Sequence, residues 1–259
     1  MPLKKGFLEI NQKEKTEVVD KLIEKSAPSY DFFLMYFLAV VITCLGLLIN
    51  SSAVVIGGML ISPILYPLLS LAMGITIADV KLIRRSSLLL LEIVVGTLIV
   101  SALISLLVFN REINPEILSR ISPNLAYFFI ALIAGLAGAY AFAKPGLSEI
   151  LPGIAIAVAV LPPLVVSGMG FSFLNWRMII GSFGLFFINM VGVVFAGVLV
   201  FSLLGFYEKK KYISQKVIKE EKDLEKEKKL NQMKEIKEMT KKLDEVKKIL
   251  TDNKNEKKL

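Results

Sequence analysis

The stretch NSSAVVIGGMLISPILYPLLSLAMG, from Asn50 to Gly74, is apolar enough to lie in lipid but contains two prolines, Pro63 and Pro67. Each proline removes one helical hydrogen bond and its ring clashes with the preceding turn, so two prolines four residues apart predict a kink or a break. The stretch opens with an uncharged polar turn in which Ser51 or Ser52 can cap the following helix. We therefore expect a broken membrane segment, either a kinked span or a re-entrant hairpin.

A similar segment returns 96 residues later. YPLLSLAMG, residues 66–74, aligns with PPLVVSGMG, residues 162–170, which pairs Pro67 with Pro163. The register continues through the pair Asp79 and Asn175, which we expect to be equivalent turn or cap residues. Matches at one ungapped offset across two elements predict an internal duplication, and internal repeats are typical of transporter folds.

Composition indicates a membrane protein. The chain has 259 residues, of which 54% are hydrophobic, and its mean hydropathy is +0.63. The apolar residues form blocks near or above the ~20 residues that a spanning helix needs. These blocks are 32–49, 53–77, 86–109, 125–143, 150–173 and 178–206. The expected fold is an all-α membrane domain over residues 32–206, with about six transmembrane helices in two inverted three-helix repeats, about 30–109 and about 125–205.

Positive charge predicts the orientation of the chain. The loop 79–85 contains Lys81, Arg84 and Arg85, whereas the loop 110–124 has two Arg against two Glu. Cytoplasmic loops carry the excess of Lys and Arg. We therefore expect a multi-pass protein of the cell membrane with both termini in the cytoplasm.

Two charged segments flank the membrane domain. In residues 1–31, KEKTEVVDKLIEK places Val18, Val19, Leu22 and Ile23 on one helical face. We expect this amphipathic helix to lie on the membrane surface, where it either orients the first span or senses lipid or a receptor.

The tail, residues 207–259, has eighteen Lys against twelve acidic residues, a net charge of +6 (18 − 12). Apolar residues at three-four spacing predict either a short coiled coil in a homo-oligomer or a solvated helix stabilised by charge pairs. These residues are Ile236, Met239, Leu243, Val246 and Leu250. Binding of the tail to anionic lipid is a third interpretation.

Polar residues within the apolar blocks are candidate ligands for a solute or ion. Glu92 is the one carboxylate deep in a predicted span, so it is either a proton or cation site, a neutral structural carboxyl, or a snorkelling group. Asn189 lies one residue beyond Ile188, which corresponds to Glu92 at the offset of 96. Asn189 either forms one polar site together with Glu92 or makes a contact between helices. The other candidates belong to the broken segments: Asn50, Ser51, Ser52, Ser62, Pro63, Tyr66, Pro67, Pro162 and Pro163.

Catalytic chemistry has little support. The chain has no His and a single Cys, Cys44, so the usual zinc and haem ligand sets are missing. It has no HExxH, paired aspartates or GxSxG. We expect no enzyme activity, no cofactor and no metal, and no nucleic-acid partner, because no aromatic platform accompanies the lysines of the tail.

The motifs SSAVVIGGMLISPILYPLLSLAMGI, followed by a DVK loop, and AVAVLPPLVVSGMG resemble the uncharacterised hydrophobic domain family catalogued as domain of unknown function 389. The resemblance covers about residues 30–205 and implies a multi-spanning prokaryotic membrane protein. It implies no catalytic residues and no particular function.

Two functions remain open at this point. The first is a transporter or channel, in which the two broken helices hold an unknown small solute or ion near the membrane midplane. The second is an oligomeric scaffold or sensor whose basic tail recruits a partner or lipid. The lipid bilayer is a partner in both.

Overall fold

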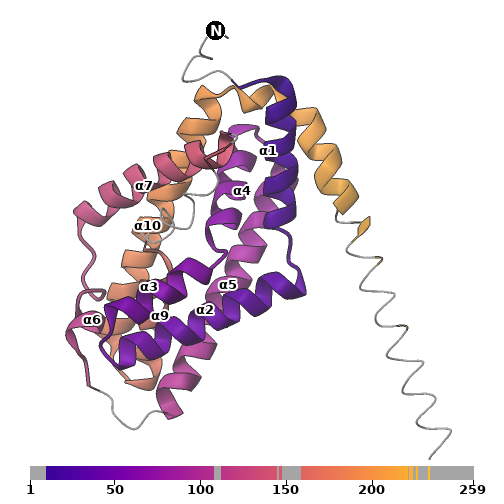
Figure 1. The fold of residues 1–259 in the computed structure, drawn as a ribbon. Coiled ribbons are helices and arrows are strands. Elements are labelled where there is room, and N and C mark those ends of the chain that lie inside the picture. The colour runs from indigo at the N-terminus through magenta and orange to yellow at the C-terminus, as the bar shows by residue number, and fades with distance from the viewer. Residues whose placement is uncertain are drawn as a thin grey trace, which may run out of the picture. The chain divides into compact units, whose positions relative to one another are not determined.

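The computed structural model is helical throughout the residues that it describes, which are 10–107, 112–144, 146–147, 159–220, 222–223, 226 and 233 (Figure 1). The elements are α1 (Gln12–Lys25), α2 (Tyr30–Leu48), α3 (Ser52–Ile61), α4 (Leu65–Thr76), α5 (Val80–Leu107), α6 (Pro115–Leu118), α7 (Leu125–Ala143), α9 (Leu161–Ser172), α10 (Trp176–Leu203) and the 3-10 helix η2 (Phe206–Lys209). Residues 1–214 form one compact unit and residues 215–259 a second. The predicted coiled coil, from 236 to 250, lies outside the described residues.

The membrane character that composition predicts is confirmed. Four helices, α2, α5, α7 and α10, are long and apolar enough to cross a membrane, and α3 with α4 adds a fifth segment bent by 52°. The sequence predicts six spans. Within the described residues α9 has only 12 residues, and residues 148–158 before it lie outside the description, so the structure supports four to five spanning helices.

The helices α5 and α10 run in opposite directions (Figure 1). The Ser214 hydroxyl donates a hydrogen bond to Asp79 just before α5, and Lys15 Nζ of α1 donates to the Gly205 carbonyl just after α10, at 3.1 Å. The start of α5 and the finish of α10 therefore share one end of the bundle, which we call the α1 end. The start of α10 lies at the opposite end, the α6 end, where Gly181 approaches the Ile121 carbonyl.

The bent segment α3–α4 crosses the bundle. At the α6 end, Asn50 Oδ1 before α3 accepts a hydrogen bond from the Glu116 N–H at 3.2 Å. At the α1 end, α4 finishes at Thr76, three residues before Asp79. The segment therefore reaches from the α6 end to the α1 end of the bundle, with a bend of 52° at its break.

Local structure repeats at the offset of 96 residues. The helix α4 matches α9 and α5 matches α10 in both length and register. Ala78 and Leu174, in the two intervening turns, have φ angles of 49° and 50°. Asp79 Oδ1 then accepts from the Leu82 N–H, as Asn175 Oδ1 does from Met178 N–H. The prediction that Asp79 and Asn175 are equivalent cap residues is confirmed.

These matching helices also pack on each other reciprocally. A Cβ atom on Gly168 of α9 would lie against Ser101 of α5 and 2.9 Å from the Leu98 Cα atom. At the positions offset by 96, a Cβ atom on Gly197 of α10 would lie 2.6 Å from the Ala72 Cβ atom of α4. Because Ala72 corresponds to Gly168 and Ser101 to Gly197, the two contacts exchange partners, as contacts across a two-fold axis do.

Small residues also hold α7 against α10. A Cβ atom on Gly135 would lie 2.8 Å from the Ala196 Cβ atom, and one on Gly192 would lie 3.0 Å from the Ala131 Cβ atom. Small side chains let helix backbones approach closely. The small-residue face of α7 thus packs against α10 in the interior of the fold.

The helix α1 packs on protein through the apolar face that the sequence assigns to the membrane surface. Val19, Leu22 and Ile23 are at most 2% exposed, and α1 contacts α4 and α7. Its polar face contacts η2, because Gln12 Nε2 and Lys15 Nζ both donate to the Glu208 carboxylate. The Gln12 hydrogen bond and the charge of Lys15 lower the pKa of Glu208. The predicted amphipathic helix is confirmed, but its apolar face covers the bundle and not lipid.

Replacing Gly168 by Ala is expected to destabilise the protein, because the added methyl group meets the Leu98 backbone and the Ser101 side chain. Overpacking of this kind costs about 1–3 kcal/mol. The variant should therefore unfold at a lower temperature when helicity is followed by circular dichroism in detergent. Gly57→Ala is the matched control, because a methyl group there meets nothing within 4 Å. Equal melting temperatures for the two variants would contradict the close contact between α5 and α9.

Candidate functional site

The first break separates α3 from α4 at Ser62 and Pro63. Pro63 has no N–H to continue α3, and a residue before proline is pushed to extended conformation. Ser62 has φ −67° and ψ 122° accordingly, and its N–H ends α3 with a hydrogen bond to the Met59 carbonyl. Pro67 does not break the chain. It occupies the first turn of α4, where a helix needs no N–H donor.

The second break precedes α9. Pro162 and Pro163 lie in the first turn of α9, and Ala159 before it has a φ angle of 44°. Because prolines lack an N–H, Pro162 and Pro163 leave the carbonyls about four residues earlier without helical donors. Asn189 of α10 supplies one donor, because its Nδ2 atom lies 3.2 Å from the Ala159 carbonyl oxygen. Asn189 therefore makes an interhelical contact, which was one of its two interpretations. Val158 lies outside the described residues.

The two breaks meet at a small cavity of about 10 Å³. Its lining comes from both segments: Met59, Ser62, Ile64, Leu65, Leu68, Val160 and Leu161. A volume of this size holds about one water molecule. Ser62 is 8% exposed, and among the described residues its hydroxyl has no hydrogen-bond partner. Asn189 Oδ1, 2% exposed as a residue, is also without a partner in the described part of the chain.

Helix ends converge on this cavity. Met59 belongs to the last turn of α3, Leu65 begins α4 and Leu161 begins α9. From there α4 runs to the α1 end and α9 to the α6 end, where α10 begins. The N-terminal ends of α4 and α9 carry partial positive charge and the C-terminal end of α3 partial negative charge. Helix dipoles therefore act on an occupant of the cavity. None of the residues that line it carries an ionised side chain.

Tyr66 and Ser167 point elsewhere. The Tyr66 ring lies 6.0 Å from the Phe142 ring of α7, measured between centroids. Ser167 donates a hydrogen bond to the Ile179 carbonyl at 3.0 Å. No three His, Cys, Asp or Glu side chains of the described residues lie close enough together to hold a metal ion.

Glu92 lies in a different environment from Asn189. Glu92 is exposed on the outer side of α5 and lines a groove of about 230 Å³ beside α2. Counting by 96, Asn189 corresponds to Ile93, which is buried, and Glu92 to Ile188. A shift of one residue turns a helix position by about 100°. Although Glu92 and Asn189 are only one residue away from equivalent positions, the Glu92 side chain lies outside the bundle and the Asn189 side chain lies inside it.

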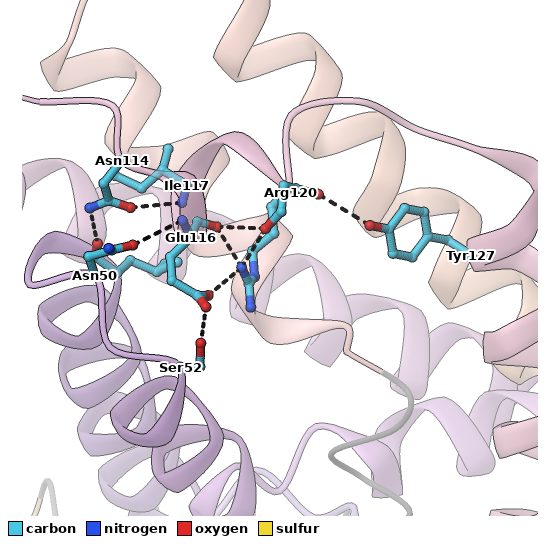
Figure 2. A network of polar contacts seen from close by, with 9 residues as sticks. Asn50, Ser52, Asn114, Glu116, Ile117, Arg120 and Tyr127 are labelled. Atoms are coloured by element: carbon cyan, nitrogen blue, oxygen red, sulfur yellow. Dashed lines mark hydrogen bonds and ion pairs between the residues drawn. The ribbon is translucent and has the colours of Figure 1, made fainter.

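The turn from Asn50 to Ser52 is held by α6 (Figure 2). Asn50, with a φ angle of 57°, accepts from the Glu116 N–H through Oδ1. The Ser52 hydroxyl donates to the Glu116 carboxylate, which also forms an ion pair of 2.6 Å with Arg120. Ser51 occupies the cap position of α3, but its side chain makes no capping bond. The predicted serine capping bond is therefore absent at Ser51, and the Glu116 carboxylate lies at the start of α3, where its charge suits a helix N-terminus.

Further contacts fix α6 on both sides, and sequence reasoning missed them. Asn114 Nδ2 donates to the Leu47 carbonyl at the end of α2, at 2.7 Å, and Tyr127 of α7 donates to the Ser119 carbonyl at 3.3 Å. Two local signals in the loop were available. Asn114 before Pro115 is a helix-start pattern, and Glu116 with Arg120 is an i,i+4 pair.

Glu116→Ala is expected to loosen the turn between α2 and α3, because Ser52 loses its acceptor and Arg120 its ion-pair partner. Leaving such groups unpaired costs about 1–3 kcal/mol. Amide hydrogen exchange at residues 50–54, followed by mass spectrometry, should become faster. Glu112→Ala removes an exposed carboxylate from the same loop and should leave that exchange unchanged. If both variants exchange like the wild type, the contacts in Figure 2 do not hold the turn.

Known proteins resemble the chain across this region. Residues 59–195 match the family described as Domain of unknown function (DUF389). An uncharacterized protein of Methanocaldococcus jannaschii is 32% identical over 177 residues, which are 68% of this chain and 55% of that relative. The chain thus spans about half the length of the relative, and no solved structure matches it. Since the match extends over more than half of its 259 residues, the chain belongs to the DUF389 family, as its broken segments and helical membrane fold indicate.

Proposed function

We propose that the protein is a transporter or channel that moves a small solute or ion through the region where its two broken segments meet. The observation that carries the proposal is the small cavity lined by residues of both breaks. Membrane transporters commonly bind solutes where discontinuous helices meet near the midplane. Helix ends and freed backbone groups then supply the ligands.

Inverted repeats are the second support. The helices α5 and α10 match in length and register but run in opposite directions. Two halves related in this way across a membrane produce alternating access when one half moves against the other. In this proposal the membrane domain has about six spans, and its two halves are about 30–109 and about 125–205.

The cavity is small in this structure, and its volume admits about one water. Passage therefore requires α3–α4 or α9 to move away from the other break. Loop and domain motions of this kind are slow steps in many proteins with lids and gates. The kink at Pro63 is the natural hinge, because the two half-helices α3 and α4 share no continuous hydrogen bonding across it.

We place the α1 end in the cytoplasm of a cell-membrane protein. Lys81, Arg84 and Arg85 follow directly after Asp79 at this end. At the α6 end, Arg120 is paired with Glu116. An excess of Lys and Arg on one side is the pattern of the cytoplasmic face.

Chemical modification at the break tests the pathway in folded protein. In a Cys44→Ala background, Ser62→Cys is nearly isosteric, and its thiol should react with a methanethiosulfonate reagent when the break opens. We expect reaction to abolish flux measured in liposomes across a panel of ions and small solutes. Ser202→Cys, at an exposed position of α10, should react without loss of flux. The proposal fails if wild type, Ser62→Cys and Glu92→Gln all show no flux for any solute in the panel.

Deletion of residues 215–259 separates transport from the alternative of a membrane scaffold or sensor. The cut falls at the boundary between the two compact units and keeps Tyr212 and Ser214, which contact Asp20 and Asp79. Transport should survive the deletion, because no lining residue of the cavity is removed. Full loss of flux, with melting temperature unchanged, would favour the tail as the functional part.

A further inference from the structure

Glu92 lies midway along α5. It lies within the apolar block 86–109, seven residues beyond Arg85, the last basic residue before that block, which is about 10 Å along the helix at 1.5 Å per residue. Its neighbours on the outer surface of α5 are strongly exposed, including Leu88, Leu91 and Val95. In a membrane this surface faces lipid, so the Glu92 carboxylate lies beside lipid-facing apolar side chains.

A carboxylate at this depth requires neutralisation by a proton or a cation. No hydrogen bond or ion pair of Glu92 occurs among the described residues. The sequence contains no Lys or Arg in any of the apolar blocks from 32–49 to 178–206. A second copy of the chain would place its own basic residues at the same membrane ends. The apolar blocks of a second copy therefore offer Glu92 no basic side chain either.

The groove beside Glu92 has space for more than a proton. Its volume is about 230 Å³, and three aromatic side chains of α2 line it: Phe33, Tyr36 and Phe37. The Tyr36 hydroxyl already pairs with Thr97, at 2.7 Å, so the ring is left for apolar contact. Gly96 adds room, since nothing lies within 4 Å of a Cβ atom built there.

This lining selects among cations. Metal ions such as Ca²⁺ and Mg²⁺ need about six oxygen ligands, whereas the groove offers one carboxylate. Aromatic rings and a single carboxylate are the groups that bind organic ammonium ions, through cation–π attraction and charge. An apolar groove open to lipid also accepts an alkyl chain.

We propose that the α2–α5 groove binds a lipophilic organic cation, with the positive group at Glu92 and the apolar part along Phe33 and Phe37. This site shares no lining residue with the cavity between the breaks, and it stands independently of the transport proposal. Nothing in its geometry requires the cation to pass through the protein.

The test is equilibrium dialysis of radiolabelled octyltrimethylammonium against purified protein in maltoside micelles, with protein-free micelles subtracted. Octanesulfonate, with the same chain length and the opposite charge, is the ligand control. Saturable binding of the cation and none of the anion is expected. Glu92→Gln should weaken cation binding about tenfold or more, whereas Glu112→Gln should not change it.

A second test of cation binding uses a variant whose side chain fills the groove. Gly96→Phe fills the open space of the groove and should abolish saturable binding, whereas Ile99→Phe, on the exposed surface of α5, should preserve it. The proposal is overturned if wild type shows no saturable binding or if Glu92→Gln binds like wild type. It is also overturned if Glu92→Gln and Gly96→Phe reduce the oligomer size in light scattering while cation binding persists, because a second copy would then cover the groove.

Discussion

Backbone groups released by proline must be satisfied by protein in the middle of this bundle, since lipid offers no hydrogen bonds. Asn189 of α10 meets this constraint for the second break by donating to the Ala159 carbonyl. At the first break the Ser62 N–H turns back to the Met59 carbonyl. The prolines in the first turns of α4 and α9 remove N–H groups that would otherwise need acceptors. A break in both segments is tolerated because few polar groups are left exposed there.

The same constraint explains why close helix contacts surround the breaks. Gly168 lets α9 approach α5, and Gly197 lets α10 approach α4, so that each broken half-helix is covered by the long helix of the other half. Without these contacts the ends of α4 and α9 would face lipid. The remaining space is small, and the Ser62 hydroxyl, which has no hydrogen-bond partner among the described residues, is a polar group that an occupant would meet.

Several features follow from short-range sequence and were predictable. Pro63 ends α3 because a missing N–H acts on the adjacent turn. Asp79 and Asn175 cap their helices because a cap side chain reaches only two or three residues along the chain. Contacts between distant segments were not predictable in this way. The carboxylate at the start of α3 comes from Glu116, and α1 is covered by α4 and α7, because shape and partner availability decide such contacts after the helices have formed.

The sequence by itself determined the membrane class, the places where the chain breaks and the matching turns 96 residues apart. Hydropathy, proline and cap chemistry act locally, so they can be read without knowing which helices meet. Tertiary structure alone decided that Asn189 faces the break while Glu92 faces a groove of Phe33, Tyr36 and Phe37. One residue of displacement rotates a side chain by about 100°. What a side chain at a given position faces therefore depends on how neighbouring helices pack against each other through their small residues.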